Sequence, residues 1–157
     1  MRTSLPLLVS LAALLISCGS EPKPPATAPP EAAGPKPADE SRRFPLANQV
    51  GTQVIDNKLL GHPFMPGGTL ASFKKGKVEY SMFVARLPAA TDAALLLLDW
   101  KKALTDAKLI PSFGGYFGQD EGHPVFVFTK GAWIAGVAGL PEKDADLEAR
   151  SLAAHLD

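Results

Sequence analysis

The stretch TLASFKKGKVEYSMFVARL, residues 69–87, decides the fold of this 157-residue chain. Two apolar runs, 69–73 and 78–87, flank a polar turn that contains glycine, and this order predicts a β-hairpin. Side chains of the second run alternate between two faces: Val78, Tyr80, Met82 and Val84 share one, and Ser81, Phe83, Ala85 and Leu87 share the other. Because both faces are largely apolar, we expect a central strand that is covered on both sides over part of its length.

Downstream of the hairpin, the sequence predicts a helix from Asp92 to about Lys108, with Thr91 as its N-cap. Apolar residues recur there at helical spacing and form one continuous stripe: Ala93, Leu96, Leu97, Trp100, Ala103, Leu104 and Ala107. Leu95 and Leu98 fall off this stripe. They are either covered by a second layer or exposed as a patch for a partner.

The C-terminal third predicts further strands and a second helix. The glycine-rich aromatic segment 113–118 fits a bulged strand or a loop, and 125–129 and 132–138 predict two strands joined by a tight turn. The chain then ends in a helix with a buried stripe formed by Ala145, Ala149, Leu152 and Leu156. Upstream of the hairpin, 49–55 is compatible with a short edge strand, and 61–68 is predicted to be loop because Pro and Gly punctuate it so densely.

This order of elements predicts a single α+β domain over residues 44–157, an antiparallel sheet packed by two helices. The domain carries 11 Lys and Arg against 12 Asp and Glu, so its balanced charge argues against a nucleic-acid partner. From PGGTL at 66–70, through KGAWI at 130–134, to the last helix, the sequence resembles uncharacterised domains of bacterial exported proteins. That resemblance implies no particular activity.

The first 17 residues have the features of a signal peptide. Arg2 precedes an apolar run, Leu5 to Ile16, which is shorter than the roughly 20 residues a membrane-spanning helix needs. The run ends in Leu15-Ile16-Ser17-Cys18, which holds the only cysteine of the chain. This pattern resembles the lipobox of bacterial lipoproteins, although a residue smaller than Ile16 is commoner at that position.

The resemblance implies that the thiol of Cys18 is diacylated and that the leader is cut just before it. The partner would then be the lipid bilayer, reached through acylated Cys18, and the protein would belong to the cell envelope. Gly19-Ser20 follow the cysteine, where the family uses Asp for inner-membrane retention, so the periplasmic face of the outer membrane is favoured in cells that have one. The alternative is a secreted protein with a free cysteine near a conventional cleavage site.

Residues 18–43 are predicted to form a disordered tether. From Gly19 to Arg43 the chain is rich in Pro and Ala, and it contains no aromatic residue and no aliphatic residue larger than Ala. Such a segment cannot bury enough apolar surface to offset the entropy lost on ordering. A docking site for a proline-recognising partner is the other interpretation.

The domain shows little sign of catalytic chemistry. His62 and His123 share the local frame Gly-His-Pro, and together with Asp120 they are candidates for a metal site, but helical or CxxC-type ligand spacing is absent. No serine stands in a GxSxG motif. The chain is therefore not expected to be an enzyme, and no cofactor is predicted.

We therefore expect a non-catalytic module that binds an envelope protein or a small ligand. The candidate binding residues, Phe64, Met65, Tyr116 and Phe117, could line a groove. The competing interpretation is that these four side chains pack at the edge of the core. The alternative function is a small envelope hydrolase or a metal-binding protein that uses His62 and His123.

Overall fold

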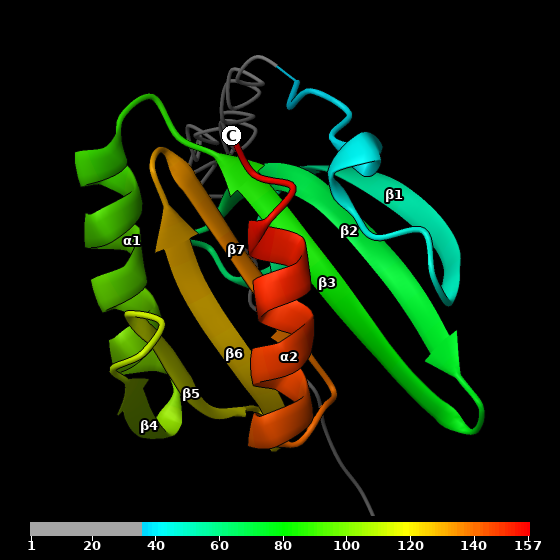
Figure 1. Ribbon diagram of the computed structural model, residues 1–157. Coiled ribbons are helices and arrows are strands. Elements are labelled where there is room, and N and C mark those ends of the chain that lie inside the picture. Colours follow the sequence, from blue (N-terminus) through cyan, green and yellow to red (C-terminus); the bar gives the residue numbers. More distant parts are fainter. Residues whose placement is uncertain (1–35) are drawn as a thin grey trace, which may run out of the picture. The chain divides into compact units, whose positions relative to one another are not determined.

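The computed structural model describes residues 36–157 (Figure 1). The predicted signal peptide, Cys18 and most of the predicted tether lie outside the described residues. None of the described helices is long and apolar enough to span a membrane.

The described residues form one seven-stranded sheet in the order β1-β2-β3-β7-β6-β5-β4, and every neighbouring pair is antiparallel. The strands are β1 (Gln49–Asn57), β2 (Pro66–Lys75), β3 (Val78–Arg86), β4 (Thr105–Ile110), β5 (Gly115–Asp120), β6 (His123–Lys130) and β7 (Trp133–Ala138). The helices are α1 (Ala90–Ala103) and α2 (Glu142–Ala153), with short 3-10 turns η1 (Ser41–Arg43) and η2 (Leu59–Gly61). The prediction of an α+β fold is confirmed.

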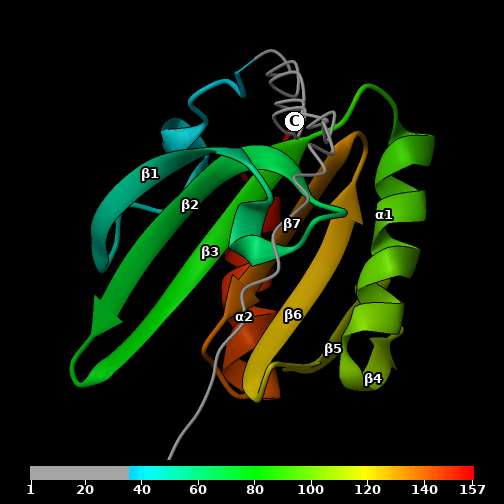
Figure 2. The ribbon, with the colours of Figure 1, turned by 180° about the vertical axis from the view of Figure 1, so that it is seen from behind.

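The two helices cover opposite faces of the sheet, as Figures 1 and 2 show. On one face, α2 packs its stripe Ala145, Ala149 and Leu152 against Met82, Phe126 and Val137 and their neighbours. On the other, α1 packs Leu96, Leu97 and Trp100 against Phe83, Val127 and Ile134 and their neighbours. The sheet therefore separates two apolar cores, which we call the α2 core and the α1 core.

β3 is the strand that serves both cores. It lies between β2 and β7, and its residues 82–85 are all buried. Met82 and Val84 belong to the α2 core, and Phe83 and Ala85 to the α1 core. The prediction of a central strand covered on both sides is confirmed.

The predicted helix from Asp92 to Lys108 was wrong at both ends. The helix begins at Ala90, with Ala89 rather than Thr91 at its N-cap and no capping side-chain hydrogen bond. It stops at Ala103, because Leu104 takes an extended conformation and the chain continues as β4. Pairing with β5 satisfies the β4 backbone, so a long-range partner outweighs the local helical spacing.

The predicted loop over 61–68 was also wrong in its last three residues, which open β2. Gly67 and Gly68 lie where the sheet leaves no room for a side chain. A Cβ on Gly67 would stand 2.2 Å from the Asp56 carbonyl oxygen, and one on Gly68 would stand 2.3 Å from that of Val84. These glycines allow close approach of neighbouring backbones rather than a turn.

The packing of the domain starts before the predicted boundary at Phe44. The backbone N–H of Glu40 donates a hydrogen bond to Thr69 Oγ1 at 3.0 Å. The Arg43 guanidinium lies over the Trp133 ring and donates to the His155 carbonyl at 3.1 Å. Residues 40–43 thus join the domain, although the sequence predicted them as the end of a disordered tether.

Candidate functional site

The α1 face of the sheet is covered over only part of its area. Helix α1 and the η2 segment lie over β6, β7 and the adjoining parts of β3 and β2, whereas neither of the described helices covers the end of the β2–β3 hairpin on this face (Figure 2). Ser72 and Glu79 are accordingly exposed there. We call this uncovered area the open half of the sheet.

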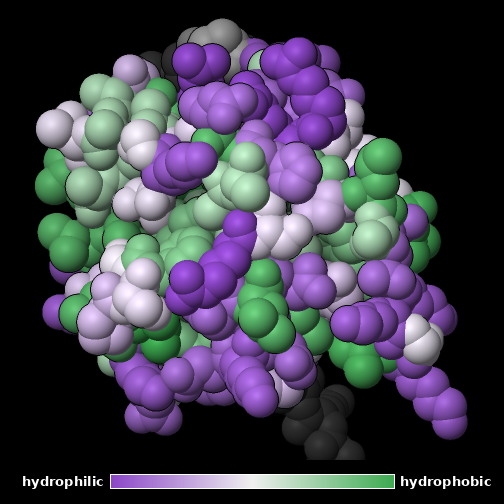
Figure 3. Space-filling view, in the orientation of Figure 1, coloured by the Kyte–Doolittle hydropathy of each residue, from purple (hydrophilic) through white to green (hydrophobic). Residues whose placement is uncertain are grey.

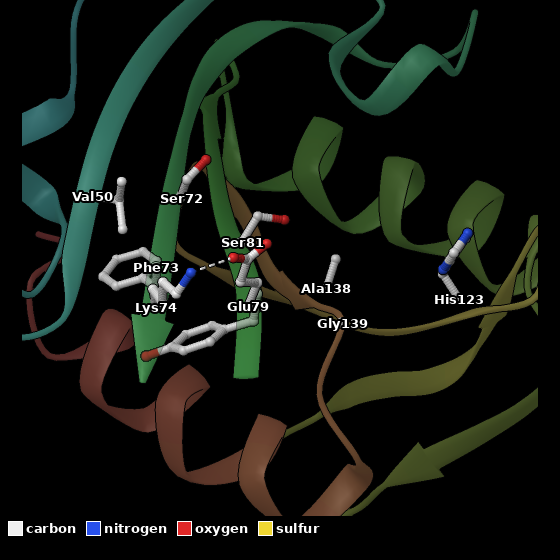
Figure 4. A pocket seen from close by; sticks show the side chains of 10 residues that line it. Val50, Ser72, Phe73, Lys74, Glu79, Ser81, His123, Ala138 and Gly139 are labelled. Carbon is white, nitrogen blue, oxygen red and sulfur yellow. Dashed lines mark hydrogen bonds and ion pairs between the residues drawn. The ribbon is translucent and has the colours of Figure 1, made fainter. Parts of the chain in front are cut away.

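The open half contains a depression of about 540 Å³ that is open to solvent (Figure 4). Its lining includes Ser72, Lys74, Glu79, Ser81, His123 and Ala138. Ser72 and Ser81 are direct cross-strand partners, and Ser81 also pairs with Ala138 on β7. Three adjacent strands thus present small side chains at one point, which is why the surface is hollow there.

An ion pair borders the depression. Lys74 Nζ lies 2.8 Å from Glu79 Oε1 across the hairpin, as the dashed line in Figure 4 marks. The hydrogen bond between the two side chains raises the pKa of Lys74 above its ordinary 10.5 and lowers the pKa of Glu79 below 4.5. Because both groups are exposed to water, the pair adds little to stability, but it leaves both charges available to a partner.

His62 and Asp120 form a second polar contact, under α1. His62 Nε2 lies 2.8 Å from Asp120 Oδ2, and each side chain is 16% exposed. The imidazole stacks on Phe64 at 4.9 Å and meets Trp100 edge-on at 4.6 Å between ring centroids. The contact fastens the segment after η2 to the end of β5, and the aromatic rings account for the position of the imidazole.

His123 does not complete a metal site with this pair. It stands opposite Asp120 in the β5–β6 hairpin, is exposed, and lines the depression. Within residues 36–157 no three side chains of His, Cys, Asp or Glu gather closely enough to hold a metal ion. The structure therefore brings together two of the three candidate ligands, His62 and Asp120, without a third.

The four candidate groove residues are divided between the two faces of the sheet. Phe64 and Met65 belong to the α1 core, where Met65 is buried and its sulfur lies 3.1 Å from Trp100 Nε1. Tyr116 packs on the same core, with the Lys101 ammonium 5.5 Å from its ring centroid. Phe117 packs on the α2 core. The four side chains do not line one groove, and their contacts are those of residues at the edge of a core.

One feature of the sequence indicates the position of the depression. In a hairpin with its turn at 74–77, Ser72 and Ser81 fall opposite each other, between the apolar pair Leu70–Phe83 and the charged pair Lys74–Glu79. Two small polar residues paired in this way predict a hollow, hydrophilic spot on the sheet. No local pattern indicates that His123 lines the depression, because β6 is brought near the β2–β3 hairpin only by the intervening strand β7.

Tyr80, which lies in the α2 core, should make the stability of the domain depend on pH. Its ring stacks on Phe73 at 5.1 Å between centroids, and burial together with the nearby Glu148 carboxylate raises its pKa to about 12. Above pH 10 the tyrosine of the unfolded chain loses its proton, whereas the folded chain keeps it until about pH 12. The free energy of unfolding should therefore fall as pH rises from 10 to 12.

Tyr80→Phe should reduce that fall, because phenylalanine has no proton to lose. The measurement is urea unfolding of both chains at a series of pH values between 9 and 12. Equal slopes of stability against pH in the two chains would contradict this account of Tyr80.

No protein-family model matches the chain, and no curated protein matches it in sequence.

Proposed function

We propose that this chain is a lipid-anchored protein of the bacterial cell envelope whose folded domain is a non-catalytic binding module facing the periplasm. The anchor is Cys18, supported by the resemblance of residues 15–18 to a lipobox. Two or three acyl chains on one cysteine give durable attachment, since each buried methylene contributes about 0.8 kcal/mol. In a cell with two membranes, Gly19-Ser20 favours the outer one.

The depression in the open half of the sheet is the observation that carries the binding role. Its volume, about 540 Å³, is in the range of ligand sites, but it is open rather than enclosed. Ser72 and Ser81 offer hydroxyl groups that both donate and accept hydrogen bonds, and Lys74 and Glu79 offer one charge of each sign. An open, polar, mixed-charge surface fits a protruding segment of an envelope protein better than a small apolar molecule.

The role of His62 supports a non-catalytic interpretation. A general base needs a free ring nitrogen within reach of a substrate in a shaped cleft. Asp120 engages only one of the two ring nitrogens of His62, but the ring is packed against Phe64 and Trp100 and does not line the depression. These contacts indicate that His62 holds the segment after η2 in place.

Photocrosslinking in intact cells tests the binding role. A benzoylphenylalanine at Ser81 in the full-length protein should give a covalent adduct of defined mass with one envelope protein. The same probe at Leu147, an exposed position on α2 outside the depression, is the matched control and should give none.

A second substitution links the adduct to the depression. Ser72→Arg would fill the hollow from the neighbouring strand and should abolish the adduct at Ser81 without lowering the melting temperature, because Ser72 is exposed. No adduct at Ser81, or equal adducts at Ser81 and Leu147, would refute a partner at this site.

A further inference from the structure

β1 is an end strand whose outer edge is unpaired in the described structure. It is nine residues long, most of it is exposed, and Asp56 is its only charged residue. Hydrophobic side chains gather around it: Leu46 is 86% exposed, Val50 68% and Val54 38%. Figure 3 shows hydrophobic colour on the side of the molecule where β1 lies.

The opposite edge of the sheet, β4, is protected against pairing. β4 has six residues, a break in register between Thr105 and Lys108, and a left-handed residue, Asp106, at φ 54°. Lys108 on the same strand pairs with Glu142 of α2 at 2.7 Å. Short length, irregularity and charge are the usual defences of an exposed edge. β1 has weaker forms of two of them, an irregularity between Gln49 and Gly51 and a single charge, Asp56. Gly51–Asn57 still forms a regular edge.

The direction of the backbone groups on that regular edge follows from the ladder. The N–H of Lys58 donates to the Met65 carbonyl at 3.1 Å, so Lys58 bonds toward β2. Along an antiparallel strand, successive residues direct their backbone N–H and C=O groups to opposite sides. Every second residue before Lys58 therefore also bonds toward β2: Asp56, Val54 and Thr52. The N–H and C=O groups of the intervening residues point outward: Gly51, Gln53, Ile55 and Asn57.

We propose that the outer edge of β1 pairs antiparallel with β1 of a second copy of this chain, with the twofold axis at Val54. Residue 54 is the centre of the regular segment 51–57, so this register uses all four outward-facing residues of each copy. Gly51 then lies opposite Asn57, and Gln53 lies opposite Ile55. The two sheets join into one continuous sheet.

The side chains suit this register. Val54 meets its own copy at a pair without hydrogen bonds between the two residues, where side chains lie closest, and the contact buries two exposed valines. Asp56 lies opposite Thr52, so no like charges face each other across the junction. An edge whose single charge is placed opposite a neutral residue of the other copy is self-complementary, which favours a second copy over a charged partner strand.

The chain's own N-terminal segment is a poor occupant of the same edge. Residues 18–35 contain six prolines, which have no N–H to donate to a ladder: Pro22, Pro24, Pro25, Pro29, Pro30 and Pro35. Pairing between copies does not depend on the lipid anchor or on the depression.

Disulfide trapping tests the register. In the full-length chain with Cys18→Ala, Val54→Cys is the only thiol. At the twofold axis the two Cα atoms would be about 4.5 Å apart, within the range a disulfide spans, so mild oxidation should give a covalent dimer. Thr52→Cys on the same face is the matched control. The two copies of residue 52 would lie four residue steps, or about 13 Å, apart and should not crosslink.

A backbone substitution separates specific pairing from chance collision. Gln53→Pro removes an outward N–H and no bond to β2, so it should abolish the Val54→Cys dimer while changing the melting temperature little. Sedimentation of the Cys18→Ala chain should show a monomer–dimer equilibrium that Gln53→Pro shifts to monomer. A chain that stays monomeric at all concentrations, or equal crosslinking at residues 52 and 54, would overturn the proposal.

Discussion

Replacing Trp100 by alanine is expected to lower the free energy of unfolding by about 3–5 kcal/mol, the cost of truncating a large buried aromatic residue. Trp100 is fully buried and joins three parts of the α1 core. Its ring lies 5.9 Å from that of Phe83 on β3 and 5.5 Å from that of Phe64, and its Nε1 lies 3.1 Å from the sulfur of Met65. Urea unfolding of the substituted and native chains measures the loss.

Leu98→Ala on the same helix is the matched control. Leu98 is 46% exposed and lies outside the α1 core, so its truncation should cost less than about 1 kcal/mol. Hydrogen exchange in residues 59–65 should rise in the Trp100 variant, because Phe64 and His62 lose a contact, and should not change in the Leu98 variant. Equal losses of stability in the two variants would show that α1 is not held by Trp100.

Cys18→Ala is expected to abolish lipid labelling completely. The lipid is attached through a thioether between the cysteine sulfur and a glycerol carbon, and alanine has no sulfur to form one. If the proposed anchor is correct, the variant should remain uncleaved or appear in the wrong cell fraction, whereas the native chain fractionates with membranes. Metabolic labelling with a fatty acid, followed by fractionation and mass spectrometry of the mature N-terminus, measures each part.

Ser20→Ala, two residues after the cysteine, is the control for this substitution and should keep the label. Normal membrane fractionation of the Cys18 variant would contradict the lipid anchor. So would an unmodified native N-terminus at a position other than Cys18.

The local signals in the sequence predicted the elements that neighbours along the chain determine. The hairpin over 69–87 and the stripe of the last helix were predicted correctly, because alternation and helical spacing each select one conformation there. Local signals failed where a distant strand decides the conformation. Residues 105–108 continue the helical spacing but pair with β5, and Gly67 resembles a loop residue but fits between neighbouring strands.

The candidate site was harder to predict than the fold, for the same reason. Phe64, Tyr116 and Phe117 are aromatic residues close to glycines, a composition shared by ligand grooves and core edges. For Tyr116 and Phe117 the outcome depends on the face of β5 from which each ring projects, and for all three residues it depends on what covers the ring. Residues of five strands line the depression, and only the pairing of Ser72 with Ser81 can be read from the hairpin alone.

The contacts of Arg43 have a mechanical consequence. Arg43 binds the His155 carbonyl and the Asp157 carboxylate, more than 110 residues along the chain, and Trp133 Nε1 donates to the Asp157 carbonyl at 2.8 Å. A pull applied to the chain ahead of Glu40 would load the Glu40–Thr69 hydrogen bond and then this junction between the two ends of the domain, before any strand begins to peel. Any force that the proposed tether transmits from a moving membrane would thus act first on these few polar contacts near the two ends of the domain. The sheet would stay intact until they break.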